Sequence, residues 1–133
     1  GQLGSEHTMV VHSDDGMDEL SVCAPAQVSE LKNGKISHYK VTPEEFGITR
    51  ANIEDLVVND STESLQMIDA VLAGEFGAPR DMVALNAGAG IYVSGLSTTL
   101  ADGVKAAYAA IDNGSALAAK NAYVSATNDG AKA

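Results

Sequence analysis

The segment from Pro79 to Gly95 constrains the fold most, because its helical pattern leaves almost no polar stripe. Apolar side chains recur on every side of the expected helix: Met82, Val83, Leu85, Ile91, Tyr92 and Val93. A helix with this pattern is buried on most of its surface. Gly88 and Gly90 each cost about 1 kcal/mol relative to alanine inside a helix, so another element is expected to approach closely there. The rest of the chain must therefore surround this helix.

Strand signals are confined to the first part of the chain. The run from Thr8 to His12 is short, β-branched and apolar on both faces, which predicts a strand buried in a sheet. The segment from Leu20 to Val22 is expected to continue a meander, and Asn33-Gly34 suits the two-residue turn of a polar hairpin. The sequence therefore predicts few strands, all of them before residue 42.

Helix signals dominate from Thr42 onward. Thr42 and Glu45 form a capping box for a single turn that Gly47 ends, and a second short turn starts at Asn52. Three longer helices are expected besides the one from Pro79: from Ser61, as its cap, to Gly74; from Leu100 to Asn113; and from Ser115, as its cap, to about Ala126. Their expected inner faces are Leu65, Ile68 and Leu72 in the first, and Leu100, Val104, Tyr108 and Ile111 in the second. Few strands followed by several helices predict the α/β class.

The two ends of the chain bear on its domain organisation. We expect residues 1–127 to form one folded portion and 128–133 a flexible polar tail. The opening residues Leu3 to Ser5 resemble the close of a helix whose body is not present, which predicts that the chain begins inside a larger domain. A complete mixed α/β domain with one short sheet is the alternative.

Net charge and composition exclude several classes of function. The chain has 18 acidic and 8 basic residues, a net charge of −10, which repels nucleic acid and anionic lipid. A phosphorylated substrate would need a metal ion or clustered cations to bind. No apolar run approaches the ~18 residues of a membrane span, and residues 1–20 lack signal-peptide features. Because Cys23 is the single cysteine and is read as a half-buried small residue, we predict a cytoplasmic protein.

The densest cluster of functional side chains directly follows the Thr8–His12 run. Asp14, Asp15, Asp18 and Glu19 place four carboxylates in six positions, and they repel one another unless they are solvated or bound to a cation. A turn at Gly16 would let them converge. Such oxygen ligands suit Mg²⁺, which takes one or two carboxylates, several waters and substrate phosphate oxygens. A solvated acidic turn is the alternative.

Other polar residues are interpreted as structural. His12 is expected to make a hydrogen bond at the end of its strand, and Asn86 to bond a neighbouring backbone group. Arg80 is expected to form a surface ion pair with Asp81. The remaining histidines, His7 and His38, are expected at the surface.

Residues 15–19, Asp-Gly-Met-Asp-Glu, resemble the Asp-Gly-Leu-Asp-Glu motif of the anthranilate phosphoribosyltransferases, and Val10-Val11-His12 precedes them as in that family. Further blocks that resemble the family follow in order: Pro43 to Gly47, Val71 to Glu75, Leu85 to Ala87, and Ala110 to Ala116. The resemblance covers nearly the whole chain. It implies the C-terminal part of the large α/β domain of a phosphoribosyltransferase, of the nucleoside phosphorylase/phosphoribosyltransferase type.

The resemblance implies transfer of the phosphoribosyl group from phosphoribosyl pyrophosphate to anthranilate, in tryptophan biosynthesis. Asp18 and Glu19 match the motif residue by residue and would hold Mg²⁺, which neutralises the departing pyrophosphate. No proton transfer is assigned to them. The alternatives are a related phosphorylase or phosphoribosyltransferase paralogue of the same fold, and a non-catalytic proteolytic fragment.

The chain also departs from the family. Ser13 stands where the family usually has glycine, and Ala24 to Ala26 replaces a segment richer in hydroxyl groups. The family's glycine-rich diphosphate loop, its anthranilate-binding arginine and its dimerising helical domain lie upstream of the residues present. We therefore expect the segment to be inactive alone, with an apolar face around residues 8–12 and 79–95 that binds the upstream part or another copy. The full-length enzyme is expected to be a homodimer.

Overall fold

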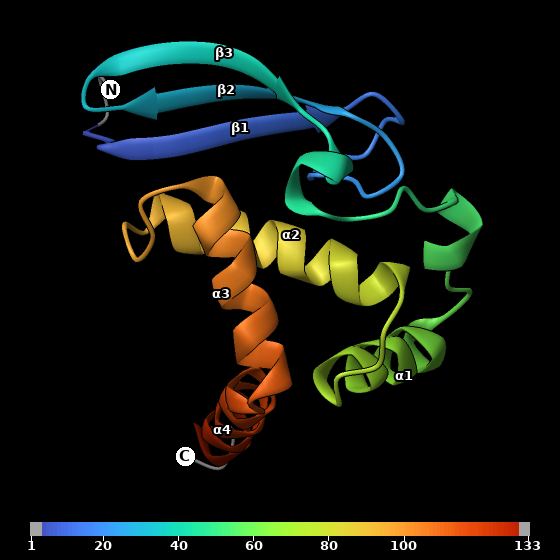
Figure 1. Ribbon diagram of the computed structural model, residues 1–133. Coiled ribbons are helices and arrows are strands. Elements are labelled where there is room, and N and C mark those ends of the chain that lie inside the picture. The colour runs from blue at the N-terminus through green and yellow to red at the C-terminus, as the bar shows by residue number, and fades with distance from the viewer. Residues whose placement is uncertain (1–3, 131–133) are drawn as a thin grey trace.

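The computed structural model describes residues 4–130, which form a small sheet followed by helices (Figure 1). The strands are β1 (His7–Ser13), β2 (Ala26–Lys32) and β3 (Lys35–Val41). Two 3-10 turns, η1 (Pro43–Phe46) and η2 (Ile53–Leu56), precede the helices α1 (Ser61–Leu72), α2 (Ala78–Val93), α3 (Leu100–Asp112) and α4 (Ser115–Gly130). This order confirms the predicted α/β class. No described helix is long and apolar enough to cross a membrane.

The three strands form an antiparallel sheet in the order β1-β2-β3. Asn33, at φ 52°, and Gly34, at φ 73°, connect β2 to β3 through the predicted two-residue turn, with Lys32 paired to Lys35. These positive φ angles favour glycine and asparagine, which explains why this turn was readable from the sequence. The hairpin prediction is therefore confirmed.

The prediction that the Thr8–His12 run is buried on both faces was wrong. Among the described residues β1 pairs with β2 alone, and the side chain of Val10 on its outer face is 66% exposed. The inner face packs against the core through Met9 and Val11. The segment Leu20 to Val22 is buried but forms no strand. A one-sided antiparallel sheet thus replaces the expected buried one.

Helix α2 lies beneath the inner face of the sheet and contacts β1, η2, α1 and α3 (Figure 1). Val28 from β2 and Leu85 from α2 are each 2% exposed and belong to one core. The buried members of that core are Leu20, Val22, Ala26, Val28, Val41, Ile48, Met82, Leu85 and Val104. Burial of the nearly all-apolar α2 therefore follows the prediction.

The closest approach between helices is the crossing of α2 and α3. A Cβ atom added to Gly88 would lie 2.5 Å from Val104 Cα, and one added to Gly103 would collide with the Gly88 carbonyl oxygen. The predicted close approach is therefore confirmed at Gly88. At Gly90 a Cβ would meet open space, so the prediction was wrong there.

Local capping signals explain most helix boundaries. The Thr42 N–H donates to Glu45 Oε1 at 2.9 Å, which confirms the capping box of η1. The cap of α1 is Asp60, whose Oδ1 accepts from the N–H groups of Thr62 and Glu63, so the assignment to Ser61 was one residue late. The expected inner face of α1 was also wrong in part, since Leu65 and Ile68 are 50% and 45% exposed.

Helix α4 is longer than expected, because it continues to Gly130. Ser115 is its first residue and not its cap; the Ser115 N–H donates to Asn113 Oδ1 at 2.9 Å. Lys120 pairs with Asp69 of α1. Residues 128–130 of the expected tail belong to this helix. Residues 131–133 and Leu3 lie outside the described residues, so the proposed division at residue 127 stays a prediction.

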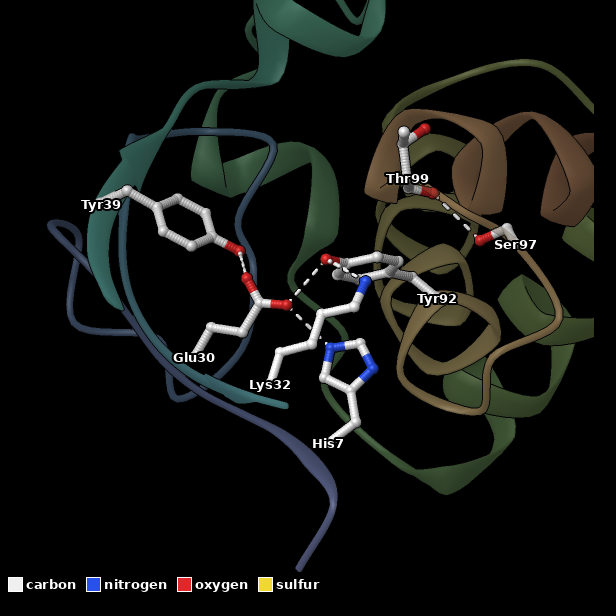
Figure 2. A network of polar contacts seen from close by, with 7 residues as sticks. All are labelled: His7, Glu30, Lys32, Tyr39, Tyr92, Ser97 and Thr99. Carbon is white, nitrogen blue, oxygen red and sulfur yellow. Dashed lines mark hydrogen bonds and ion pairs between the residues drawn. The ribbon is translucent and has the colours of Figure 1, made fainter. Parts of the chain in front are cut away.

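A buried carboxylate joins the sheet to the C-terminal end of α2. Glu30 is 7% exposed and accepts hydrogen bonds from Tyr92 at 2.7 Å and Tyr39 at 2.8 Å, and its Oε1 lies 2.8 Å from His7 Nε2 (Figure 2). Lys32 Nζ donates to the Tyr92 hydroxyl at 3.0 Å. Burial raises the pKa of Glu30, but the three hydrogen bonds outweigh it and leave that pKa below its usual value.

The crossing at Gly88 yields a stability prediction. Gly88→Ala should destabilise the chain by about 1–3 kcal/mol, because the backbone of Val104 cannot move away as a side chain would. Gly90→Ala is the matched control on the same helix, and it should gain up to about 1 kcal/mol of helix propensity. Urea unfolding measures both. Equal midpoints for the two variants would contradict the close packing of α2 on α3.

The network around Glu30 yields a pH prediction. Its lowered pKa means that its contribution to stability is complete above the unfolded-state pKa, about 4.3, and is lost as pH falls through the folded-state value. Glu30→Gln should therefore cost about 1–3 kcal/mol at pH 7 and progressively less below pH 4. Thermal unfolding against pH measures this, with the exposed Glu6→Gln as control. A cost that is independent of pH would show that the charge of Glu30 does not matter.

Candidate functional site

The acidic residues lie on the connection from β1 to β2, which turns back on itself directly after β1. The Ser13 N–H donates to the Met17 carbonyl at 3.0 Å, and the Gly16 N–H donates to the Ser13 carbonyl at 2.9 Å. Gly16 has φ 92°, a conformation that other residues adopt at a cost. Asp18 and Glu19 follow on an exposed bend, so they lie on a loop and not on a continuous strand.

Two of the four carboxylates are already engaged. Asp14 pairs with Lys40 Nζ at 2.8 Å, and this hydrogen bond is the main reason why the pKa of Asp14 is lowered. Asp15 Oδ2 accepts from the Ser21 hydroxyl at 2.5 Å, and its Oδ1 accepts from the Met17 N–H at 3.2 Å. Each of these two carboxylates stabilises the loop itself.

Asp18 and Glu19 are different, since neither carboxylate makes a hydrogen bond or ion pair to another residue within 4–130. Burial raises the pKa of Glu19 first, and the negative charge of Asp18 raises it further. The two residues are neighbours in the chain, and a shared cation would relieve the repulsion between their charges. The described residues contain no cluster of three or more histidine, cysteine, aspartate or glutamate side chains arranged to hold a metal.

The backbone behind the pair is held from two sides. The Ser13 hydroxyl donates to the Glu19 carbonyl at 2.8 Å and accepts from the Ser21 N–H at 3.0 Å. Asn86 of α2 accepts from the Leu20 N–H at 3.0 Å and donates to the Leu20 carbonyl at 2.8 Å. The backbone directly after Asp18 is therefore held between the end of β1 and the middle of α2.

An apolar hollow lies beside Glu19, which lines its edge. It is formed by the loop, η2, α1 and α2, and its lining includes Met17, Leu56, Met67, Val71, Met82 and Val83. A carboxylate at the border of such a surface loses part of its hydration, which disfavours its charged form. This loss of hydration is the main cause of the raised pKa of Glu19.

Several of the polar residues interpreted as structural lie where they were expected, but His7 does not. Asn86 bonds backbone groups as predicted, and His38 is exposed as predicted. His12 is exposed near the end of β1 and its side chain makes no hydrogen bond to another residue within 4–130, so the bond expected there is not seen. Cys23 is half-buried, and burial raises the pKa of its thiol. His7 was placed wrongly at the surface, because it contacts the buried Glu30.

The assignment of Arg80 to a surface ion pair was also wrong. Arg80 is 5% exposed, and its Nη2 donates to Asp112 Oδ1 of α3 at 2.6 Å. Its Cζ lies 4.4 Å from the ring centre of Phe76 and 5.2 Å from that of Tyr108. Asp81 accepts from the Tyr108 hydroxyl instead. The ion-pair partner of Arg80 therefore lies on α3 and is not its sequence neighbour Asp81.

No pattern in the sequence pointed directly to the buried serines of the site. Ser13 is 0% exposed and Ser21 is 2% exposed, yet each has an ordinary polar side chain in a segment that reads as a loop or strand end. Their importance depends on the chain folding back, so that the residues on either side of the acidic bend meet. Only the departure from the family's glycine at Ser13 marked the position in advance.

The fold and the acidic loop define a class. Residues 1–117 match the model of the glycosyl transferase family, a/b domain, and the chain belongs to that family. Its sequence is similar to that of the anthranilate phosphoribosyltransferase of Marinomonas sp., at 53% identity over 86% of this chain and 34% of the relative. The corresponding protein of Methylococcus capsulatus is 50% identical over 88% of this chain and 34% of its own length.

Solved structures agree with the sequence comparison. The anthranilate phosphoribosyltransferase (TrpD) of Thermus thermophilus superposes with a TM-score of 0.81 at 37% identity, covering 90% of this chain and 35% of that one. A Saccharomyces cerevisiae enzyme of the same name, in complex with PRPP and Mg, gives 0.73 at 20% identity over 84% of this chain and 32% of its own, which shows the fold alone. The chain therefore spans about a third of the length of these relatives.

The repulsion between the two free carboxylates yields a prediction. Asp18→Asn should lower the pKa of Glu19 only part of the way to its usual value, because burial, the larger cause, remains. Asp14→Asn should leave that pKa unchanged, since Asp14 is engaged with Lys40. A ¹³C NMR titration of the Glu19 carboxyl measures both. An unchanged Glu19 pKa in Asp18→Asn would show that the two groups do not face a common space.

Proposed function

We propose that this chain is the metal-binding portion of an anthranilate phosphoribosyltransferase, which transfers the phosphoribosyl group of phosphoribosyl pyrophosphate to anthranilate in tryptophan biosynthesis. Asp18 and Glu19 hold Mg²⁺. The observation that carries the metal role is that these two carboxylates alone, of the four on the loop, have no protein partner among the described residues. The 53% identity to the Marinomonas enzyme carries the choice of reaction.

The donor set fits this metal. Mg²⁺ in proteins is typically bound through one or two carboxylates together with substrate phosphates, and it keeps several waters. Asp18 and Glu19, adjacent and exposed on a stabilised loop, supply the carboxylate ligands. They leave the other coordination positions of the ion open to water and substrate phosphate. The ion supplies positive charge that stabilises the departing pyrophosphate. In this proposal Asp18 and Glu19 bind and orient the ion, and neither needs to move a proton.

Most of the site must come from residues outside this chain. The segment spans 34% of the Marinomonas relative, and the resemblance places the family's diphosphate loop and anthranilate-binding arginine upstream of it. Misplacement by about 1 Å can cost about a hundredfold in rate, so the isolated chain should be inactive. We propose that an upstream part of the same protein, or another copy, completes the site and that the full enzyme is a cytoplasmic homodimer.

Exposed apolar side chains support such a partner. Val10 on β1 is 66% exposed and Val83 on α2 is 40% exposed, in the two regions where the sequence predicts an uncovered face. Single exposed apolar side chains are ordinary on a protein surface, but the outer face of the sheet also carries Ile36, which is 69% exposed and lines one hollow together with Val10. In this proposal the upstream residues cover both.

The test joins this chain to the upstream portion of the Marinomonas relative and measures phosphoribosyl transfer with excess Mg²⁺. Asp18→Asn with Glu19→Gln should lower kcat by about a hundredfold or more while the KM for anthranilate changes little, because the metal acts on the departing pyrophosphate. Glu6→Gln with Glu54→Gln removes the same charge at exposed positions outside the loop and should retain activity. Undiminished turnover in the first variant would remove the metal role, and transfer by the isolated chain would refute the need for a partner.

A further inference from the structure

The backbone from Glu19 to Ser21 is fastened at four consecutive polar groups. Ser13 binds the Glu19 carbonyl and the Ser21 N–H, and Asn86 binds the N–H and carbonyl of Leu20. These bonds come from side chains on two elements, the end of β1 and the middle of α2. These four bonds hold the connection at the residues that directly follow the acidic pair.

Burial makes these bonds durable. Ser13 is 0% exposed and Leu20 is 1% exposed, so water does not compete for their polar groups. The Ser13 hydroxyl uses both its donor and an acceptor position, which leaves it one orientation. The Ser21 hydroxyl in turn accepts from the Cys23 N–H at 2.9 Å and donates to Asp15. The loop is therefore fixed on both sides of the acidic pair before any ligand arrives.

We propose that Ser13 and Asn86 are positioning residues that clamp the Glu19–Ser21 backbone, so that the Asp18 and Glu19 carboxylates are held in a common place for a divalent cation. The clamp rests on the metal role proposed above and adds to it the side chains that set the geometry. Neither residue contacts the cation; each acts through the backbone that carries Glu19.

The physical reason is preorganisation. An exposed carboxylate pair on a mobile loop must lose backbone freedom when it binds an ion, and that ordering weakens the affinity. A loop already ordered by buried hydrogen bonds avoids this cost. Groups that orient metal ligands typically change metal affinity by about 10- to 100-fold when they are removed. The clamp should therefore appear in the affinity of the pair itself.

The experiment uses the ¹⁵N-labelled chain and Mn²⁺, which takes the same oxygen ligands and broadens nearby NMR signals. The readout is the Mn²⁺ concentration that halves the amide signals of Asp18 and Glu19. Ser13→Ala and Asn86→Ala should each raise it about tenfold. The exposed Ser37→Ala and Asn121→Ala are matched controls and should leave it unchanged. Hydrogen exchange at the Leu20 and Ser21 amides shows whether the bonds are lost.

Two outcomes separate the clamp from a merely structural role. If Ser13→Ala and Asn86→Ala lower the unfolding midpoint but the folded chain keeps its Mn²⁺ affinity, the clamp is refuted and the metal role stands. If Asp18→Asn with Glu19→Gln leaves the broadening unchanged, the metal role fails and the clamp fails with it. Ser13→Thr, which retains the hydroxyl, should bind Mn²⁺ like the unaltered chain; weakening to the level of Ser13→Ala would overturn the clamp.

Discussion

The contact on which the rest of the structure depends is the crossing of α2 and α3 at Gly88. Because Gly88 has no side chain, the backbone of Val104 reaches the surface of α2, which lies under the sheet, and α3 crosses α2 and runs away from the sheet (Figure 1). Asn86 lies two positions earlier on α2 and points to Leu20 instead. The same helix therefore packs α3 on one side and holds the acidic loop on another, so helix packing and loop geometry cannot vary independently.

Much of the fold was predictable because its signals are local. The Asn33-Gly34 turn, the Thr42 capping box and the apolar pattern of α2 each depend on residues a few positions apart. The errors arose where burial depends on distant partners. Periodicity could not distinguish a strand covered on both faces from β1, whose outer face is exposed, and it assigned Leu65 to an inner face that the fold leaves open.

The candidate site was likewise only partly predictable from the sequence. Its acidic cluster and the family resemblance are visible in the sequence, but the cluster alone does not show which carboxylates are free. That distinction rests on Lys40 from β3 and on Ser21 beyond the bend, which engage Asp14 and Asp15. The net charge of −10 makes the distinction important, since a free carboxylate pair is useful to a phosphorylated substrate only through a cation.

The buried Arg80 has a consequence for motion. It joins the first turn of α2 to Asp112 at the last residue of α3, while Gly88 joins the same two helices further along. Two helices that are held at one contact can rotate about it, whereas two separate contacts prevent that rotation. We therefore expect α2 and α3 to move as one rigid unit, with any hinge elsewhere in the chain.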